Sequence, residues 1–194
     1  ILLRDLITKC DVNSNQMQAK HLNKEIKLAY TKKTAEITKY LAQIYSEYKE
    51  DKKKGLVYFE EAKKIYMSIN DSVNVGLCLY EKASINSQLG NIREALANYS
   101  KALKIFENTD NKKLIARSLN GIAVIYKNQG QVKEALSHYT RSLKIFEQIK
   151  DKNGLAGALS NIGVVYKSQD QLPEAIDYYR RSLKLYREKK KKKG

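Results

Sequence analysis

The sequence predicts an all-α fold of antiparallel helix pairs that stack on one another, and two observations support this prediction. The first is a row of apolar residues at helical spacing on each of two consecutive segments within residues 154–187. These residues are Leu155, Leu159, Ile162 and Tyr166, followed by Leu172, Ala175, Ile176, Tyr179, Leu183 and Tyr186. The second is that the same pair of segments recurs upstream at an interval of 40 residues. Because one helix pair cannot bury its apolar face alone, this repetition predicts a stacked array.

The repeat is clearest in the C-terminal half of the chain. Residues 156–187 and 116–147 are identical at nearly half of their aligned positions, and a third copy lies 40 residues further upstream. A fourth copy is weaker, because its first helix aligns only after a slip of one residue. We therefore divide the chain into four predicted repeats, of which the first is divergent, over residues 34–73, 74–113, 114–153 and 154–194.

Residues 1–33 are predicted to form a further helical pair. Residues 1–9 read as one helix, and the Asp, Asn and Ser residues of segment 11–15 read as a turn. Residues 16–30 read as the second helix, whose predicted inward side chains are Ala19, Leu22, Ile26 and either Ala29 or Tyr30. This pair is either a degenerate repeat or an N-terminal cap that covers the apolar flank of the first clear repeat.

The chain is strongly basic, with a formal net charge of +16. Such a charge favours acidic protein partners, nucleic acid or an anionic membrane surface. The lysines are spread along the chain, however, with local clusters only at residues 52–54 and 189–193. We therefore interpret most of them as the solvated faces of helices.

No catalytic, metal or cofactor site is predicted. The two histidines, His21 and His138, stand on separate predicted helices without a nucleophile pattern, and we expect packing or surface roles for them. Cys10 and Cys78 lack metal-ligand neighbours and are expected to be small apolar side chains. No apolar run is long enough to span a bilayer, and the start of the chain does not have the pattern of a signal peptide.

The last two copies resemble the tetratricopeptide repeat family. The pattern of that family is matched by Leu159, Ile162, Gly163, Tyr166, Ala175, Tyr179 and Ser182, and in the preceding copy by Leu119, Ile122, Ala123, Tyr126, Ala135, Tyr139 and Ser142. The small residue, Gly163 or Ala123, is expected to let the two helices of a pair approach closely. The resemblance implies a right-handed α-solenoid.

The repeat unit here has 40 residues, whereas the common unit of the family has 34. We expect the six extra residues between one pair and the next, for example at residues 148–153. Longer units of this kind are similar to those of bacterial sensor histidine kinases and response regulators and to those of animal cell-polarity adaptors, and the wording of the repeat looks most like the bacterial signalling group. Similar arrays are extracytoplasmic in some sensors and cytoplasmic in others, and a cytoplasmic location is slightly favoured. In register, Gly194 falls on Gly154, so residues 189–193 are expected to be a connector to a further repeat.

The resemblance also implies a binding groove lined by the first helix of each pair. Carried over position by position, its candidate residues are Lys39, Tyr40, Gln43, Tyr80, Glu81, Ser84, Arg117, Asn120, Val124, Lys127, Asn161, Val164 and Lys167. The cations and amides among them suit an extended acidic segment, and the two tyrosines could serve as aromatic anchors. The lysine needed for a clamp on a terminal carboxylate is missing beside Asn120 and Asn161, which disfavours the binding of chaperone tails.

The favoured function is therefore a non-catalytic module that binds a peptide or helical partner, as the regulatory part of a larger bacterial signalling protein. One alternative is an array associated with nucleic acid through its positive charge. This alternative predicts a continuous basic stripe and binding that falls steeply with salt. Another alternative is a scaffold that associates with itself through exposed repeat ends.

Overall fold

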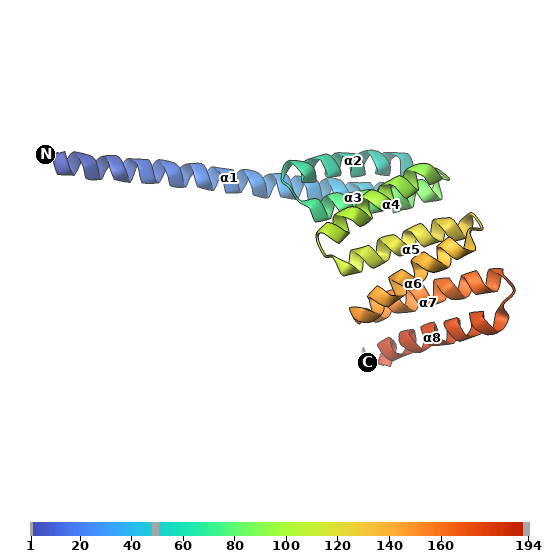
Figure 1. Cartoon of the computed structure of the whole chain (residues 1–194). Helices are drawn as coiled ribbons and strands as arrows, with labels where there is room; N and C mark the ends of the chain where they lie inside the picture. The colour runs from blue at the N-terminus through green and yellow to red at the C-terminus, as the bar shows by residue number, and fades with distance from the viewer. Residues whose placement is uncertain (1, 48–50, 192–194) are drawn as a thin grey trace. The chain divides into compact units, whose positions relative to one another are not determined.

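The computed structural model describes the backbone of residues 2–47 and 51–191, and the side chains of residue 17 and of residues 20–47 and 51–188. Over these residues the chain forms eight α-helices (Figure 1), which are α1 (Leu2–Glu47), α2 (Lys52–Ser68), α3 (Ser72–Gln88), α4 (Ile92–Asn108), α5 (Lys112–Asn128), α6 (Val132–Gln148), α7 (Lys152–Ser168) and α8 (Leu172–Lys191). The helices pack as sequential antiparallel pairs. The predicted all-α fold of paired helices is confirmed.

The chain forms two compact units. One unit comprises Ile1–Asp71 and holds α1 and α2, and the other comprises Ser72–Gly194 and holds α3 to α8. Within the second unit, α4 packs on α5 and α6 packs on α7, so three helix pairs stack in order.

The connections between helices are short and regular. From α2 to α7 each helix has 17 residues. Every connection after α2 contains one residue with a positive φ angle between 47° and 80°, namely Asn70, Gly90, Asp110, Gly130, Lys150 and Asp170. A left-handed residue of this kind ends a helix and turns the chain. The expected six-residue insertion between pairs is wrong: only residues 149–151 connect α6 to α7, and the additional residues lie within the helices.

The core of the second unit follows the repeat pattern. Ala123, Ala135, Tyr139, Ile162 and Val165 form one buried cluster shared by α5, α6 and α7. Leu159, Ile162 and Ala175 of the last copy are buried as predicted, whereas the predicted inward side chains Leu172, Ile176, Leu183 and Tyr186 of its second helix are 47–50% exposed. The aromatic Tyr139 fills the space between one pair and the next, as the pattern requires.

Buried serines link the two helices of a pair. The Ser142 hydroxyl donates a hydrogen bond of 2.8 Å to the carbonyl of Ala116, and the Ser182 hydroxyl donates one of 2.8 Å to the carbonyl of Ala156. At Gly163, an added Cβ would lie 3.1 Å from Tyr179 Cε1. The expected close approach of the helices at this small residue is thus present.

The N-terminal helix differs from the prediction. Residues 2–47 form one continuous helix, so the predicted turn at residues 11–15 is wrong. Asp, Asn and Ser weaken a helix only slightly, whereas Gly and Pro break it, and this segment contains neither. The expected inward side chains Leu22, Ile26 and Tyr30 are 57%, 44% and 74% exposed. The side chain of Ala19 lies outside the described residues.

The C-terminal helix also departs from the repeat register. α8 continues to Lys191, although residues 189–193 were expected to be a connector. In the preceding repeat the Asp151 side chain caps α7 by accepting hydrogen bonds from the Asn153 and Gly154 amides, and the equivalent residue here is Lys191, which cannot do so. Gly194 lies outside the described residues. One face of α8 is about half exposed, at Leu172, Ile176, Leu183 and Tyr186.

Candidate functional site

The first helices of the second unit, α3, α5 and α7, carry most of the predicted groove residues. On α5, the candidates recur every three or four residues, from Arg117 through Asn120 and Val124 to Lys127, and therefore share one face. The opposite face of α5 is buried at Ser118, Ile122 and Ile125. The apolar pattern thus orients the helix and leaves the polar candidates partly exposed.

An aromatic and cationic cluster joins α3, α4 and α5. The Arg117 guanidinium lies 4.8 Å from the centre of the Tyr80 ring, in a cation–π arrangement. The Tyr80 ring meets the Tyr99 ring edge to face, with centroids 5.3 Å apart. At Gly121, an added Cβ would lie 2.5 Å from Tyr99 Cζ, so this glycine makes room for the ring. Burial, together with the neighbouring Tyr80, raises the pKa of Tyr99, which therefore stays neutral.

A hydrogen bond connects the candidates of α5 and α7. The Asn161 amide donates to the Asn120 side-chain oxygen at 3.2 Å. Each amide keeps further donor and acceptor capacity, because an asparagine side chain has two N–H groups and two oxygen lone pairs. The bond fixes the orientation of both amides on the face they share.

A cavity of about 350 Å³ lies beside this cluster. Its lining residues are Tyr80, Lys113, Arg117, Asn120, Phe146, Asp151, Asn153, Gly154 and Gly157. Three of them, Tyr80, Arg117 and Asn120, were groove candidates. The structure therefore brings candidates from α3 and α5 together around one hollow.

Lys113 and Asp151 form an ion pair at the edge of the cavity, with their charged atoms 3.0 Å apart. Hydrogen bonds to the carboxylate, first from the Gly154 amide and then from Lys113, lower the pKa of Asp151. The charge of Lys113 is thus largely balanced. Among the side chains that the structure describes, Arg117 forms no ion pair, so its charge is the one available at the cavity.

The remaining candidates fall into two groups. Glu81, Ser84, Val124, Lys127, Asn161, Val164 and Lys167 are on the same three helices and are half-buried or exposed, but they do not line the cavity. Lys39, Tyr40 and Gln43 belong to α1 in the other unit. There, the Lys39 ammonium lies 5.5 Å from the centre of the Tyr66 ring, and Tyr40 is 57% exposed.

Sequence reasoning missed the cavity residues at the start of α5 and α7, among them Lys113, Asn153 and Gly157. One signal was available. A glycine within a helix is unfavourable unless space or backbone geometry requires it, and an added Cβ at Gly157 would meet no atom within 4 Å. Packing therefore does not explain Gly157, whereas its place in the cavity wall does.

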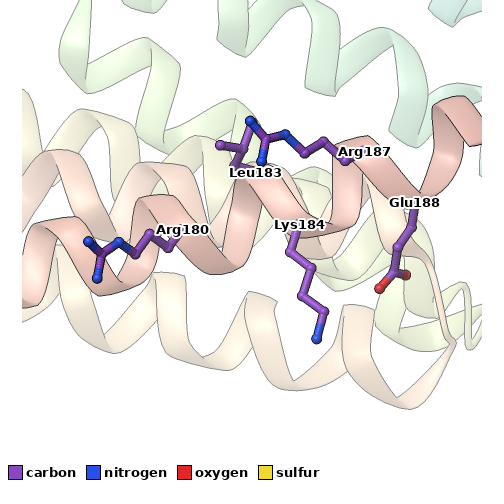
Figure 2. Close-up of a pocket in the computed structure, with 5 residues that line it drawn as sticks. All are labelled: Arg180, Leu183, Lys184, Arg187 and Glu188. Carbon is purple, nitrogen blue, oxygen red and sulfur yellow. The ribbon is translucent and has the colours of Figure 1, made fainter.

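A second hollow, of about 360 Å³, lies on α8 (Figure 2). Its lining residues are Arg180, Leu183, Lys184, Arg187 and Glu188. Leu183 and Arg187 lie together on one side of the helix, and Lys184 and Glu188 point away from them. Glu188 pairs with Lys152 of α7 at 2.6 Å, which leaves this surface with an excess of positive charge.

The histidines and Cys78 have the expected structural positions. His138 stacks on Tyr126 with ring centroids 5.5 Å apart, as Tyr178 stacks on Tyr166 in the next pair, and burial lowers the pKa of His138. His21 lies 3.6 Å from Glu25 on the exposed part of α1. Cys78 is buried, and the side chain of Cys10 lies outside the described residues.

Within the described part of the chain, no group of His, Cys, Asp or Glu side chains could hold a metal ion. Nor does any helix there combine the length and the apolar composition needed to cross a bilayer.

Comparison with known proteins identifies the repeat. Residues 114–188 and residues 78–109 each match a family model described as Tetratricopeptide repeat, and together these matches cover more than half of the chain. No curated protein matches the sequence.

Several solved structures share the fold at low identity. BtubC (BKLC) from P. vanneervenii is 23% identical with a TM-score of 0.70, over 80% of this chain and 64% of that chain. Aspartyl phosphate phosphatase F from Bacillus subtilis is 19% identical with a TM-score of 0.76, over 81% and 41%. A Rap protein complexed with Competence and Sporulation Factor is 16% identical with a TM-score of 0.69, over 78% and 42%. The chain thus spans less than two thirds of each of these proteins.

Proposed function

This chain belongs to the tetratricopeptide repeat family, and we propose that it is a non-catalytic module that binds an extended acidic peptide segment on the face formed by α3, α5 and α7. The observation that carries the proposal is the position of Arg117. The Tyr80 ring holds its guanidinium at 4.8 Å, at the edge of a cavity of about 350 Å³, without a carboxylate partner among the described side chains.

The chemistry of this face suits a carboxylate ligand. A guanidinium presents several N–H donors in a planar fork that matches the two oxygens of a carboxylate. Asn120 and Asn161 supply amide groups for the main chain of an extended peptide. Lys127 and Lys167 continue the positive charge along the same helices.

The space beside Arg117 supports the same ligand. In the aligned repeats, the position of Arg117 is occupied by Leu77 in α3 and by Gly157 in α7. With no side chain at Gly157, a ligand can approach the guanidinium from the side of α7. Tyr80 adds an aromatic surface for an apolar residue of the peptide.

The proposal is tested by selection from a random library of displayed 12-residue peptides. We expect peptides rich in Asp and Glu to be enriched on the wild-type chain and lost on the R117A variant. The matched control is R141A, because Arg141 is an exposed arginine on α6, the other helix of the same pair. Enrichment that R117A and the wild type share, or no enrichment at all, would argue against the proposal.

The proposed peptide binding also suggests the role of this chain within a larger protein. A peptide-binding array that lacks chemistry of its own suits the regulatory part of a bacterial signalling protein, including a two-component system. The Rap structure solved with Competence and Sporulation Factor supports this context by analogy of fold alone.

A second candidate function is association with nucleic acid, favoured by the net charge of +16 and by Arg180, Lys184 and Arg187 on α8. A gel retardation assay with mixed DNA and RNA at two salt concentrations separates the two candidates. Binding at physiological salt that falls steeply as salt rises would favour nucleic acid.

Association of the chain with itself through exposed repeat ends, such as the half-exposed face of α8, predicts concentration-dependent oligomers that are lost in L183K.

A further inference from the structure

An exposed apolar row runs along α1. At about 100° per residue, its members fall within a sector of roughly 100° on the helix surface. They are Leu22, Ile26, Tyr30, Ile37, Tyr40, Leu41 and Ile44, and they are between 38% and 74% exposed. The row is about 33 Å long at 1.5 Å per residue. Single exposed apolar side chains are ordinary, but a contiguous row of this length marks an interaction surface.

The row faces away from α2. The side of α1 that contacts α2 is buried at Ala35, Thr38 and Ala42, and an added Cβ at Gly55 would lie 3.1 Å from the carbonyl oxygen of Ala42. The centre of the apolar row is roughly 150° around the helix from this side. All described side chains of residues 20–30 are exposed, and α2 lies beside only the last part of α1 (Figure 1).

The C-terminal half of the row corresponds to a packing face in the later pairs. Ile44 aligns with Ile125 and Val165, which are fully buried in clusters that include Tyr99 and Tyr139 of the preceding pairs. Since α1 runs unbroken from Leu2 to Glu47, no preceding pair covers Ile44 among the described residues. The N-terminal half of the row lies on the part of α1 whose described side chains, at residues 20–30, are all exposed, and packing supplies most of the stability of helices in proteins.

The row repeats every 11 residues. Leu22, Lys33 and Ile44 follow one another at this interval. The same interval separates Ile26 from Ile37 and Tyr30 from Leu41. An 11-residue repeat corresponds to about 3.67 residues per turn, close to the 3.6 of a straight helix. Two such helices can therefore remain in contact along the whole row with only a slight right-handed supercoil.

The charges that flank the row favour a second copy of the same helix. On one flank, Glu25, Glu36 and Glu47 recur at the same 11-residue interval, and on the other flank Lys20 and Lys27 are exposed. In a parallel pair each flank faces the opposite flank of the partner helix, which brings Glu25 of one copy near Lys20 and Lys27 of the second copy. In an antiparallel pair like flanks would meet.

We propose that α1 pairs with α1 of a second copy of this chain, parallel and in register, through the row of residues 22–44. Lys33, the polar member of the row, lies 3.4 Å from Glu36 of its own helix, which balances its charge. A single polar residue in an apolar seam sets the register and the number of strands at the expense of stability. Self-pairing of this kind goes beyond peptide binding and does not depend on it.

The first test is the mass of the chain in solution, measured by light scattering after size exclusion over a range of concentrations. The wild type is expected to be a dimer, and a variant with L22Q, I26Q and Y30Q is expected to dissociate, with a Kd raised roughly a hundredfold or more. The matched control is L28Q, because Leu28 is 50% exposed on another side of the same segment. A monomeric wild type, a dimeric triple variant or an equal effect of L28Q would each overturn the proposal.

The second test reads the orientation and needs no disruptive variant. In a background with C10S and C78A, the single change I26C is expected to give a disulfide-linked dimer on mild oxidation, because equivalent residues face each other in a parallel pair. Preferential linkage between I26C and Y40C chains would instead indicate an antiparallel pair. Dissociation caused by L183K in α8 would indicate end-to-end stacking. Either result would overturn the proposal.

Discussion

The Phe146 ring of α6 occupies the space that a side chain at Gly154 of α7 would need. Gly154 therefore sets how closely the α5–α6 pair and the α7–α8 pair of the second unit pack. Gly157, one turn further along α7, meets no atom within 4 Å of an added Cβ. The two glycines line the same cavity but have different physical roles.

The first prediction separates these roles. Gly154→Ala should lower the free energy of unfolding by about 1–3 kcal/mol, because the new methyl group overlaps the Phe146 ring. Gly157→Ala should raise it by about 0.5–1 kcal/mol, because alanine favours the helix and finds open space. Urea unfolding followed by circular dichroism measures both changes. Equal effects of the two substitutions would show that α6 and α7 do not pack through the contact of Phe146 with Gly154.

The second prediction concerns the hydroxyl between α5 and α6. Ser142→Ala should lower the free energy of unfolding by about 1 kcal/mol, since the buried hydrogen bond to the Ala116 carbonyl is lost. The control is Ser100→Ala on the exposed surface of α4, where a change within about 0.5 kcal/mol is expected. A Ser142→Ala chain as stable as the wild type would mean that this hydrogen bond adds no net stability.

The third prediction is a pH dependence at the start of α7. The pKa of Asp151 is lower in the folded chain than in the unfolded chain. The ionised carboxylate therefore stabilises the fold above about pH 3.9, which is the pKa in the unfolded chain, and this stabilisation is lost as the pH falls through the pKa of the folded chain. Asp151→Ala should lower the free energy of unfolding by about 1 kcal/mol at pH 7, and the difference from the wild type should shrink below about pH 4. Urea unfolding at several pH values measures this trend.

Asn111→Ala is the matched control for Asp151. Asn111 caps α5 by accepting a hydrogen bond of 3.3 Å from the Leu114 amide, and it carries no charge. The loss of stability in Asn111→Ala should therefore stay constant over the same pH range. A parallel decline in both variants would assign the pH dependence to other groups.

The fourth prediction concerns the cavity. Gly157→Leu introduces a leucine, which is the residue that α3 carries at the equivalent position, Leu77. The substitution should leave the chain folded and weaken binding of a selected acidic peptide about tenfold or more, because the leucine fills the approach to Arg117. Fluorescence polarisation with the labelled peptide measures the change. Unaltered affinity would place the ligand elsewhere.

The repeats in the second unit could be predicted because each helix there is specified by its own sequence pattern. Small residues such as Ala123 and Gly163, and the aromatic Tyr139, stand at fixed intervals that correspond directly to buried positions. The N-terminal helix could not be predicted in the same way. Its Asp, Asn and Ser residues suggest a turn, but continuation of the helix depends on the lack of Gly and Pro over residues 2–47.

The candidate site was predicted only in part for a similar reason. Arg117 and Asn120 lie within the helix and follow from its periodicity. Lys113 and Asp151 meet only because the start of α7 packs beside the start of α5, and no pattern within one helix encodes that contact. The cation–π contact of Arg117 with Tyr80 likewise depends on how neighbouring pairs stack.

The binding of an acidic peptide beside Arg117 is tested most directly by the Kd of a selected acidic peptide for the wild type, R117A and R141A chains, measured by fluorescence polarisation. R117A should raise the Kd by roughly ten- to a hundredfold, because a charge-assisted contact between the guanidinium and a carboxylate is lost, and R141A should leave the Kd unchanged. A Kd that is the same in R117A as in the wild type would show that Arg117 does not bind the peptide.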